Sequence, residues 1–400
     1  MYKINENQFK EKYIVLIPAM LDAHFPLLKY AFFSKNYHPV ILENEKGIID
    51  TGLKYVNNDM CFPSICNIGQ MIDALQSGKY DISRTRLLMP TAGDACRGSN
   101  YLYVLRRAIK KAGFDDVKVL SLNLKGLEKD CQMKLNFSMV WRALFGLFYG
   151  DILMLLLNHT RPYEAKKGAA DKLWQSWVDK LAEDMKSGKH LTIGTMKKNF
   201  YRMAEDFAAL EKIGEKKKRV GIVGELYIKY CHIGNFDMIR FLESEGCESH
   251  TNGVSWYAMY YMDSHLTESK SFEAMLYKIG LKFFAHIQNA MIDALKKNNM
   301  YTLEGFETLK REAEDYISHN LKIGDGWLIG SEAISHILHD CPKVIAVQPF
   351  GCMPNHCCGH GVYPAINRKF PQGHVVSVDL DSGAAPVNVY NRVKMLTDFD

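Results

Sequence analysis

Near its C-terminus the chain carries an apolar run that leads into a cysteine-rich loop: Val344-Ile345-Ala346-Val347-Gln348-Pro349-Phe350-Gly351-Cys352-Met353-Pro354-Asn355-His356-Cys357-Cys358. The apolar run predicts a buried strand of a parallel sheet, because such strands are covered on both faces. Cys352 then follows the carboxyl end of this strand, where open α/β sheets place their ligands. The stretch therefore predicts an α/β fold with a ligand site at one edge of a sheet.

Two further cysteines stand in comparable loops. Cys61 comes just before Pro63 and the helical pattern 65–75, and Cys96 lies in a glycine-containing loop after the strand-like run 86–89. Proline suits the first turn of a helix, so Cys61 is expected on a loop that leads into one. We expect Cys61, Cys96 and Cys352 to converge on one iron–sulfur cluster, since three thiolates can hold a 4Fe-4S cluster and leave its fourth iron open.

Hydrophobic patterning predicts two doubly wound, Rossmann-like lobes that face a cleft, with a helical layer between them. The predicted N-terminal lobe, residues 1–125, carries Cys61 and Cys96, and the C-terminal lobe, residues 216–400, carries Cys352. Residues 126–215 show helical periodicity throughout and are predicted to form the helical layer.

Within the lobes, strands are expected to alternate with helices. Strands are predicted near 13–17, 39–42, 86–89, 117–121, 219–223, 343–347 and 375–378. Helices are predicted near 25–33, 63–75, 99–112, 236–245, 272–296, 303–317, 331–338, 362–369 and 385–396. The polar, turn-rich segment 43–60 is expected to be a loop.

Composition is that of an ordinary soluble protein, with 47% apolar and 24% charged residues and a net charge of +5. The lysines are spread along the chain, and the one tight basic cluster, Lys216 to Arg219, is interpreted as a solvated helix end, so no nucleic-acid partner is expected. Arg142 and Asp151 interrupt the apolar run 139–157, which favours a buried core helix over a membrane span. Ten cysteines without a signal sequence indicate a reducing, cytoplasmic location.

Several catalytic signatures are absent from the sequence. There is no P-loop, no dinucleotide-binding fingerprint and no nucleophile elbow, so the chain is not expected to hydrolyse ATP by itself. Zinc is an alternative to an iron–sulfur cluster. Cys61 and Cys66 are close in sequence, and a second set of potential ligands is dense enough for a tetrahedral zinc site: Cys352, His356, Cys357, Cys358 and His360. The remaining isolated cysteines and histidines are expected to be structural: Cys131, Cys231, Cys247, Cys341, His159 and His190.

Four segments together resemble the dehydratase-like component of the 2-hydroxyacyl-CoA dehydratase and activase superfamily: Asn58 to Pro63, Gly93 to Tyr101, Gly221 to Glu225 and Gln348 to His356. The resemblance covers nearly the whole chain. It implies an oxygen-sensitive 4Fe-4S cluster on Cys61, Cys96 and Cys352, which receives electrons from a separate ATP-hydrolysing activase. It also implies radical dehydration or reduction of a CoA thioester, in a homo- or heterodimer.

The chain departs from that family pattern by lacking an activase module and by offering three extra thiols, Cys66, Cys357 and Cys358. Six thiolates would suit the double-cubane 8Fe-9S cluster of some relatives, which implies reduction of small molecules without a CoA ester. A third possibility is a non-enzymatic scaffold that binds a cluster or zinc.

Four other residues are candidates for supporting roles. Arg97 can balance the charge of a cluster or thioester, while Asn100 and Asn355 can donate hydrogen bonds to cluster sulfides. Glu225 is a candidate fourth iron ligand or proton relay, with a simple helix-start carboxylate as the alternative.

Overall fold

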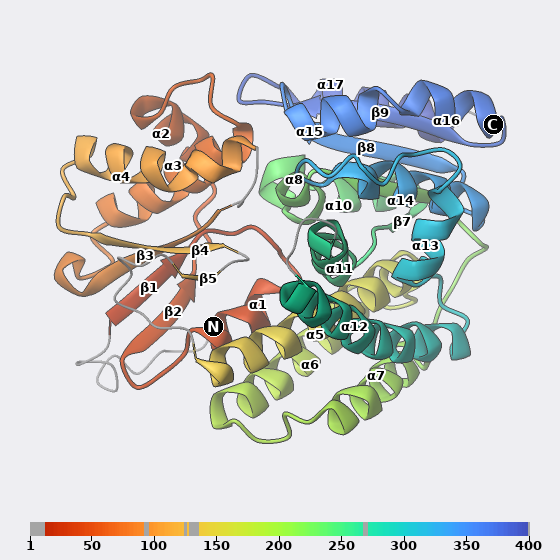
Figure 1. Cartoon of the computed structure of the whole chain (residues 1–400), viewed down its shortest axis with the longest axis horizontal. Coiled ribbons are helices and arrows are strands. Elements are labelled where there is room, and N and C mark those ends of the chain that lie inside the picture. The colour runs from red at the N-terminus through yellow and green to blue at the C-terminus, as the bar shows by residue number, and fades with distance from the viewer. Residues whose placement is uncertain (1–12, 92–95, 124–125, 128–135, 267–270, 399–400) are drawn as a thin grey trace.

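The computed structural model describes residues 13–91, 96–123, 126–127, 136–266 and 271–398. Two sheets lie at the left and upper right of Figure 1, and helices from the middle of the chain fill the space below the second sheet. This arrangement confirms the predicted α/β class with two doubly wound lobes and intervening helices.

The first sheet has the strand order β2-β1-β3-β4-β5. In β1, Val15 and Ile17 pack on one face together with Phe25, whereas Leu16 packs on the other face with Ile68 and the helices beyond it. Helices therefore cover both faces, as the alternating side chains of a buried strand require. The strands are β1 (Tyr13–Ile17), β2 (Tyr37–Ile41), β3 (Thr85–Pro90) and β4 (Lys118–Asn123), all parallel, and a short antiparallel β5 (Gly126–Leu127).

The prediction that residues 43–60 form a loop is wrong, because the helix α2 (Ile48–Tyr55) lies within this segment. A Cβ atom at Gly52 would lie 2.2 Å from the carbonyl oxygen of Ile65, and one at Gly69 would lie 1.9 Å from that of Ile48. The backbones of α2 and α3 (Phe62–Gln76) thus touch through two glycines. A residue that suggested a turn in the sequence instead allows two helices to pack closely.

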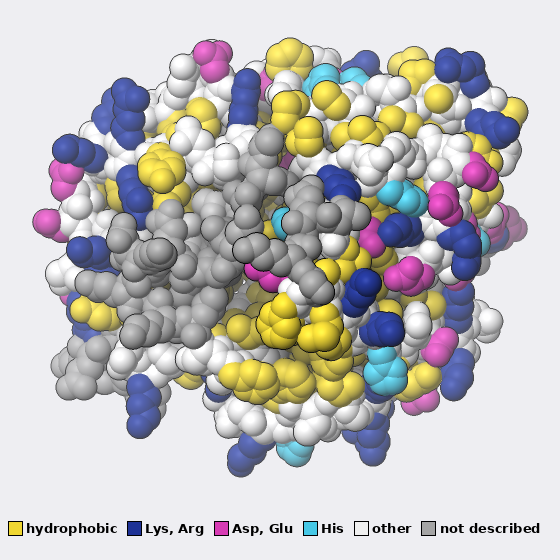
Figure 2. All heavy atoms as spheres, in the orientation of Figure 1, with side chains coloured by type: hydrophobic (Ala, Val, Ile, Leu, Met, Phe, Trp, Pro, Cys, Tyr) yellow, Lys and Arg dark blue, Asp and Glu magenta, His cyan; other side chains and the backbone are white. Residues whose placement is uncertain are grey.

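The second sheet repeats the order of the first, as β7-β6-β8-β9 with all strands parallel. Its strands are β6 (Lys218–Gly224), β7 (Cys247–His250), β8 (Lys343–Pro349) and β9 (His374–Leu380). β7 was not predicted because its residues are mostly polar, although all four are buried. The cluster Lys216 to Arg219 does not end a helix, as expected, but leads into β6, where Lys216 and Arg219 both bind Asp340. On the face shown in Figure 2, other lysine and arginine side chains are scattered.

The helical layer draws on two parts of the chain. Three of its helices come from the predicted segment, α5 (Phe137–Thr160), α6 (Ala169–Ser187) and α7 (Ile193–Ala208). Two more, α11 (Val254–Leu266) and α12 (Ser271–Lys297), follow β7 and pack into the same hydrophobic core. This core continues into the second lobe, so the layer and that lobe are stabilised together.

Among the described residues, the segment Phe137–Tyr163, which contains α5, is the one stretch long and apolar enough to cross a membrane. Most of it is buried in the protein, which confirms the predicted core helix. Asp151 is fully buried, and its Oδ1 lies 2.7 Å from Nε2 of His24 in the first lobe. The same carboxylate accepts hydrogen bonds from the backbone of Val254 and Ser255 at the start of α11. Asp151, which interrupts the apolar run of α5, therefore joins this helix to the first lobe and to the start of α11.

The predicted helix 25–33 divides into α1 (Phe25–Leu28) and a 3-10 turn, η2 (Lys29–Ala31), and the predicted helix 303–317 is the shorter α13 (Phe306–Ala313). The remaining elements are α4 (Tyr101–Lys111), α8 (Leu226–Tyr230), α9 (His232–Asn235), α10 (Met238–Ser244), α14 (Gly326–Leu338), α15 (Met353–Asn355), α16 (Tyr363–Lys369), α17 (Pro386–Asp398), the 3-10 turns η3 (Ile82–Arg84), η4 (Arg97–Asn100) and η5 (Arg161–Tyr163), and a π-helical turn, η6 (His356–His360).

Candidate metal centre

The three predicted thiols all stand at the start of a helix. Cys61 is the N-cap of α3, Cys96 precedes η4 and accepts a hydrogen bond from the backbone N–H of Gly98 at 3.2 Å, and Cys352 is the N-cap of α15. The first N–H groups of a helix lack partners within it, and its N-terminal end carries partial positive charge. Thiolates are favoured at such positions.

Glu225 and Cys352 occupy the switch point of the second sheet. Glu225 directly follows β6 and Cys352 follows β8, and these neighbouring parallel strands are the ones between which the winding direction reverses. Open α/β sheets bind ligands at this point, beyond the carboxyl ends of the strands. Glu225 is the N-cap of α8 and accepts a hydrogen bond from the backbone N–H of Ile228 at 2.9 Å.

The structure brings Cys61, Cys96, Cys352 and Glu225 together. Burial raises the pKa of the Cys61 thiol well above its usual range, and the charges of Glu225, Cys352 and Cys96 raise it further. Burial and the charge of Glu225 likewise raise the pKa of Cys352 to about 12. Groups from both sheets therefore interact electrostatically at this centre. None of the nine described cysteines forms a disulfide bond.

A buried amide and a carboxyl group adjoin Cys352. Asn355 is fully buried, and its Nδ2 lies 3.4 Å from Sγ of Cys352 and 3.5 Å from Oδ2 of Asp325. Burial and the charge of Glu225 raise the pKa of Asp325 to about 8. Burial thus favours the protonated form of Asp325, and Asn355 joins this carboxyl group to Cys352.

A buried ion pair lies beyond this carboxyl group. Nζ of Lys229 is 3.0 Å from Oε2 of Glu332 and 2.9 Å from Oδ1 of Asn252. Lys229 stands four residues after Glu225, on the short helix α8. Its positive charge lowers the pKa of Glu225, Glu332 and Asp325. Burial raises the pKa of each of these groups by more, so the net pKa is raised.

Tyr101, Asp325, Glu332 and Lys229 were not predicted as site residues. Tyr101 is buried, and its hydroxyl group hydrogen-bonds to the thiol of Cys61. In the sequence, Tyr101 lies at the end of the Cys96 loop, and Asp325 lies between two glycines. These positions are the only features of the sequence that point to either residue. Glu332 and Lys229 come into place through tertiary packing alone.

Arg97 and Asn100 lie at the outer side of the centre. Arg97 is exposed, and its Nη1 donates to the backbone oxygen of Asp59 at 2.5 Å. This bond ties the Cys96 loop to the loop that ends at Cys61. Asn100 is exposed, so it is Asn355 and not Asn100 that the structure places against a thiol.

The extra thiols lie in three different environments. Cys66 packs in a core cluster with Tyr227 of the second lobe, and burial raises its pKa to about 12. Cys357 is exposed, whereas Cys358 is buried and has its pKa raised to about 11 by burial and by Cys357. Cys131 lies outside the described residues, as do Gly93 to Ala95.

The predicted zinc ligands of the C-terminal loop bind other groups. Nδ1 of His356 lies 2.8 Å from the backbone oxygen of Cys352, and Nε2 of His360 pairs with Gln348 and Ser377. In the described parts of the chain, two other groups have three ligand atoms within 4.8 Å of one another: Asp22, Cys231 and His232, and His159, Glu248 and His250. Neither the C-terminal loop nor the thiol set forms such a group.

His159, expected to be isolated, takes part in the second of these groups. Its Nδ1 lies 2.8 Å from Oε1 of Glu248, and Nε2 of His250 lies 2.6 Å from the same oxygen. The other carboxylate oxygen accepts a hydrogen bond from the hydroxyl group of Tyr163 at 2.6 Å. Hydrogen bonds from His159 and His250 lower the pKa of Glu248 despite its burial, so this carboxylate is held by polar side chains of the protein itself.

The donor set of the thiol centre fits a cationic iron–sulfur core. Cys61 and Cys352 are buried and hard to ionise on their own, Cys96 is half-buried, and a bound metal ion would deprotonate a coordinating thiol. Ligands of one zinc ion must lie close together, and among the described residues the three thiols do not form a group with all ligand atoms within 4.8 Å of one another. No protein-family model and no curated protein sequence matches the chain.

Proposed function

We propose that the chain is the iron–sulfur component of an ATP-dependent, low-potential electron-transfer system. Cys61, Cys96 and Cys352 would hold one 4Fe-4S cluster, and a separate ATP-hydrolysing activase would supply the electrons. The observation that carries this proposal is the electrostatic interaction of Cys61 with Cys96, Cys352 and Glu225, which come from separate loops and from both lobes.

The surrounding side chains support one-electron chemistry coupled to proton transfer. When bound, the cluster supplies an electron at low potential. Asn355 and Tyr101 donate hydrogen bonds to two of the sulfur ligands, which stabilises the thiolates and tunes the potential. Asp325, whose pKa is raised by burial, would be a proton donor near Cys352, and Glu225 would either complete the iron coordination or carry a proton.

For the substrate we propose a 2-hydroxyacyl-CoA or related CoA thioester, on the basis of the sequence resemblance. A single cluster is favoured over a double-cubane cluster because Cys66 lies in a different core cluster from Cys61. Cys66 lies in the first turns of α3, where it packs with Tyr227 of the second lobe, whereas Cys61 precedes the helix.

Anaerobic reconstitution of the purified chain with ferrous iron and sulfide tests the proposal. We expect about four irons and four acid-labile sulfides per chain, together with broad visible absorption. Cys61→Ser, Cys96→Ser and Cys352→Ser should each remove most of this absorption, and Cys247→Ser, a matched buried cysteine, should not. Stoichiometric zinc without sulfide, or equal tolerance of all four substitutions, would contradict the assignment, and about eight irons would favour the double-cubane alternative.

A further inference from the structure

A second group of potential metal ligands lies where the two lobes meet, on loops that the thiol centre does not use. Asp22 comes from the loop after β1, and Cys231 and His232 stand at the junction of α8 and α9 in the second lobe. One ligand atom of each residue lies within 4.8 Å of those of the other two. Ligands around a tetrahedral zinc ion stand roughly 3–4 Å apart, so small shifts of the side chains bring these three atoms to one ion.

Hydrogen bonds hold the two loops against each other. The backbone N–H of Asp22 donates to the backbone oxygen of Tyr230 at 3.1 Å, and the backbone N–H of His232 donates to Oδ2 of Asp22 at 2.7 Å. Nδ1 of the His232 ring lies 2.8 Å from the same oxygen. Asp22 and His232 are therefore fixed side by side before an ion binds, which lowers the ordering cost of binding.

The ligands also have the outer partners that metal ligands commonly have. Nε2 of His232 lies 2.9 Å from Oε1 of Glu45, which comes from the loop after β2. A metal-bound histidine usually donates its other ring N–H to a carboxylate, which fixes the ring and raises its basicity. The hydroxyl group of Tyr227 hydrogen-bonds to the thiol of Cys231, so the sulfur has an outer partner as well.

An ion can reach this group from the solvent. Cys231 is fully buried, whereas the side chains of Asp22 and His232 are 39% and 40% exposed. Burial and the charge of Asp22 raise the pKa of the Cys231 thiol, and a bound metal ion would deprotonate it. The carboxylates of Asp22 and Glu45 face a single histidine, and this surplus of negative charge attracts a cation.

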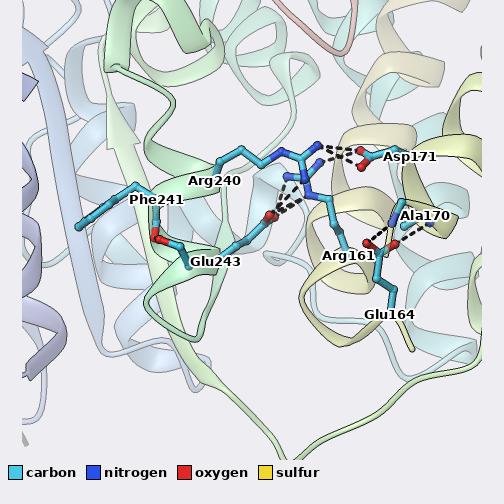
Figure 3. Close-up of polar contacts among 9 residues, drawn as sticks. Arg161, Glu164, Ala170, Asp171, Arg240, Phe241 and Glu243 are labelled. Atoms are coloured by element: carbon cyan, nitrogen blue, oxygen red, sulfur yellow. Dashed lines mark hydrogen bonds and ion pairs between the residues drawn. The ribbon is translucent and has the colours of Figure 1, made fainter. Parts of the chain in front are cut away.

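Other acids nearby are already bound by arginines. Two of the three ligands also line a cavity of about 300 Å³, and Asp171 lies on the wall of the same cavity. Asp171 is 3.0 Å from Nη2 of Arg240 and 3.3 Å from Nη1 of Arg161, and Arg161 also binds Glu243 at 2.6 Å (Figure 3). These two acids are therefore poor competitors for a cation.

We propose that Asp22, Cys231 and His232 bind one zinc ion, with the fourth position left to water on the exposed side. A thiolate, an imidazole nitrogen and a carboxylate oxygen suit zinc, whereas calcium and magnesium prefer oxygen ligands alone. The ion would join a loop of the first lobe to the second lobe and stabilise their contact. The inference goes beyond the proposed function and does not depend on it, because the zinc site shares no residue with the thiol centre.

Cobalt(II), a coloured substitute for zinc, tests the proposal in a full-length variant in which Cys61, Cys96 and Cys352 are replaced by serine. Anaerobic addition of Co²⁺ to this metal-free protein should give a thiolate-to-cobalt charge-transfer band and the visible bands of tetrahedral Co²⁺. An equal amount of zinc should abolish these bands, because zinc binds such sites more tightly than cobalt. Cys231→Ser in the same variant should remove the charge-transfer band, and Cys247→Ser, the change of another buried cysteine, should leave it unchanged.

The affinity for zinc and the melting temperature give two further readouts. Glu45→Ala should weaken zinc binding by about tenfold to a hundredfold, the usual effect of losing an outer carboxylate, and Asp22→Asn should weaken it more. Glu43→Ala is the matched control, because Glu43 is another exposed acid of the same loop and should leave the affinity unchanged. Zinc should raise the melting temperature of the triple-serine variant but not that of its Cys231→Ser form.

The proposal is overturned if the cobalt bands do not appear, if they survive Cys231→Ser, or if Cys247→Ser removes them equally. It is also overturned if Glu43→Ala weakens zinc binding as much as Glu45→Ala. Circular dichroism of each metal-free variant shows that it is folded. The iron and sulfide content of the reconstituted chain does not enter these measurements, so the zinc site and the proposed function can fail separately.

Discussion

The side-chain amide of Asn355 donates a hydrogen bond to the sulfur of Cys352, with Nδ2 and Sγ 3.4 Å apart. Both groups are buried. A hydrogen bond to a thiolate stabilises the charged form, so this contact holds the pKa of Cys352 lower than burial alone would set it.

Asn355→Leu should therefore raise the pKa of Cys352 further. A hydrogen bond to a charged group contributes about 1.5–3 kcal/mol, so the thiolate fraction at pH 9 should fall by about tenfold or more. The rate of Cys352 alkylation by iodoacetamide, followed by mass spectrometry of the metal-free protein, measures this change. The rate at Cys247 serves as the internal reference, and an unaltered ratio of the two rates would refute the contact's role.

Lys229→Met should destabilise the fold strongly. The substitution leaves Glu332, which is 1% exposed, as a buried charge without its cation. Breaking a buried pair in this way costs about 3–5 kcal/mol. The double variant Lys229→Met with Glu332→Gln should recover much of the loss, and urea unfolding of the three proteins compares them. If the double variant is as unstable as the single one, the pairing explanation fails.

Gly52→Ala should destabilise the first lobe, because the added Cβ would meet the backbone of α3 at 2.2 Å. Overpacking of this kind costs about 1–3 kcal/mol or more. Gly194→Ala is a matched control, since Gly194 lies in α7 with open space around the position of a Cβ. That change should stabilise the protein by about 0.5–1 kcal/mol. The melting temperature should thus fall in Gly52→Ala and rise in Gly194→Ala.

The stability of the protein should fall between about pH 6.5 and pH 9 through His232. Its hydrogen bond with Asp22 raises the pKa of His232 from 6.5 to about 9. Because the folded state binds the proton more tightly, the contribution is complete below the unfolded pKa and is lost as the pH rises through the folded pKa. His232→Gln should lack this part of the slope. Urea midpoints at pH 6, 7.5 and 9 test the difference, and parallel slopes would contradict it.

The sequence predicted the strands of both sheets well because their apolar runs are buried on both faces. β8 begins at Lys343 as predicted, and β1 matches the range 13–17. The helix α2 escaped prediction because its packing depends on Gly52 meeting a helix that lies later in the chain. β7 escaped because its polar residues Glu248 and His250 are buried through hydrogen bonds to each other and to residues distant in the sequence, such as His159 and Tyr163.

The candidate centre was predictable to the extent that its residues sit in recognisable loops. Cys96 and Cys352 follow strands, so their position at a sheet edge could be inferred without coordinates. Glu332 could not be inferred in the same way, because it lies within the otherwise apolar helix α14 and meets Lys229 through tertiary packing. A charged residue in such a helix is itself a sign of a buried partner.

The division of the three thiols between the lobes also bears on how the protein matures. Cys61 and Cys96 belong to one lobe and Cys352 to the other. A metal cluster bound by all three would therefore link the two lobes covalently. Such a core can be inserted only once both lobes have folded and docked. After its loss, the lobes would still be joined by the core cluster in which Phe62 and Cys66 pack with Tyr227, and by the hydrogen bond from Cys231 to the backbone oxygen of Ala19. Oxygen damage would therefore remove one link between the lobes and leave the packing between them in place.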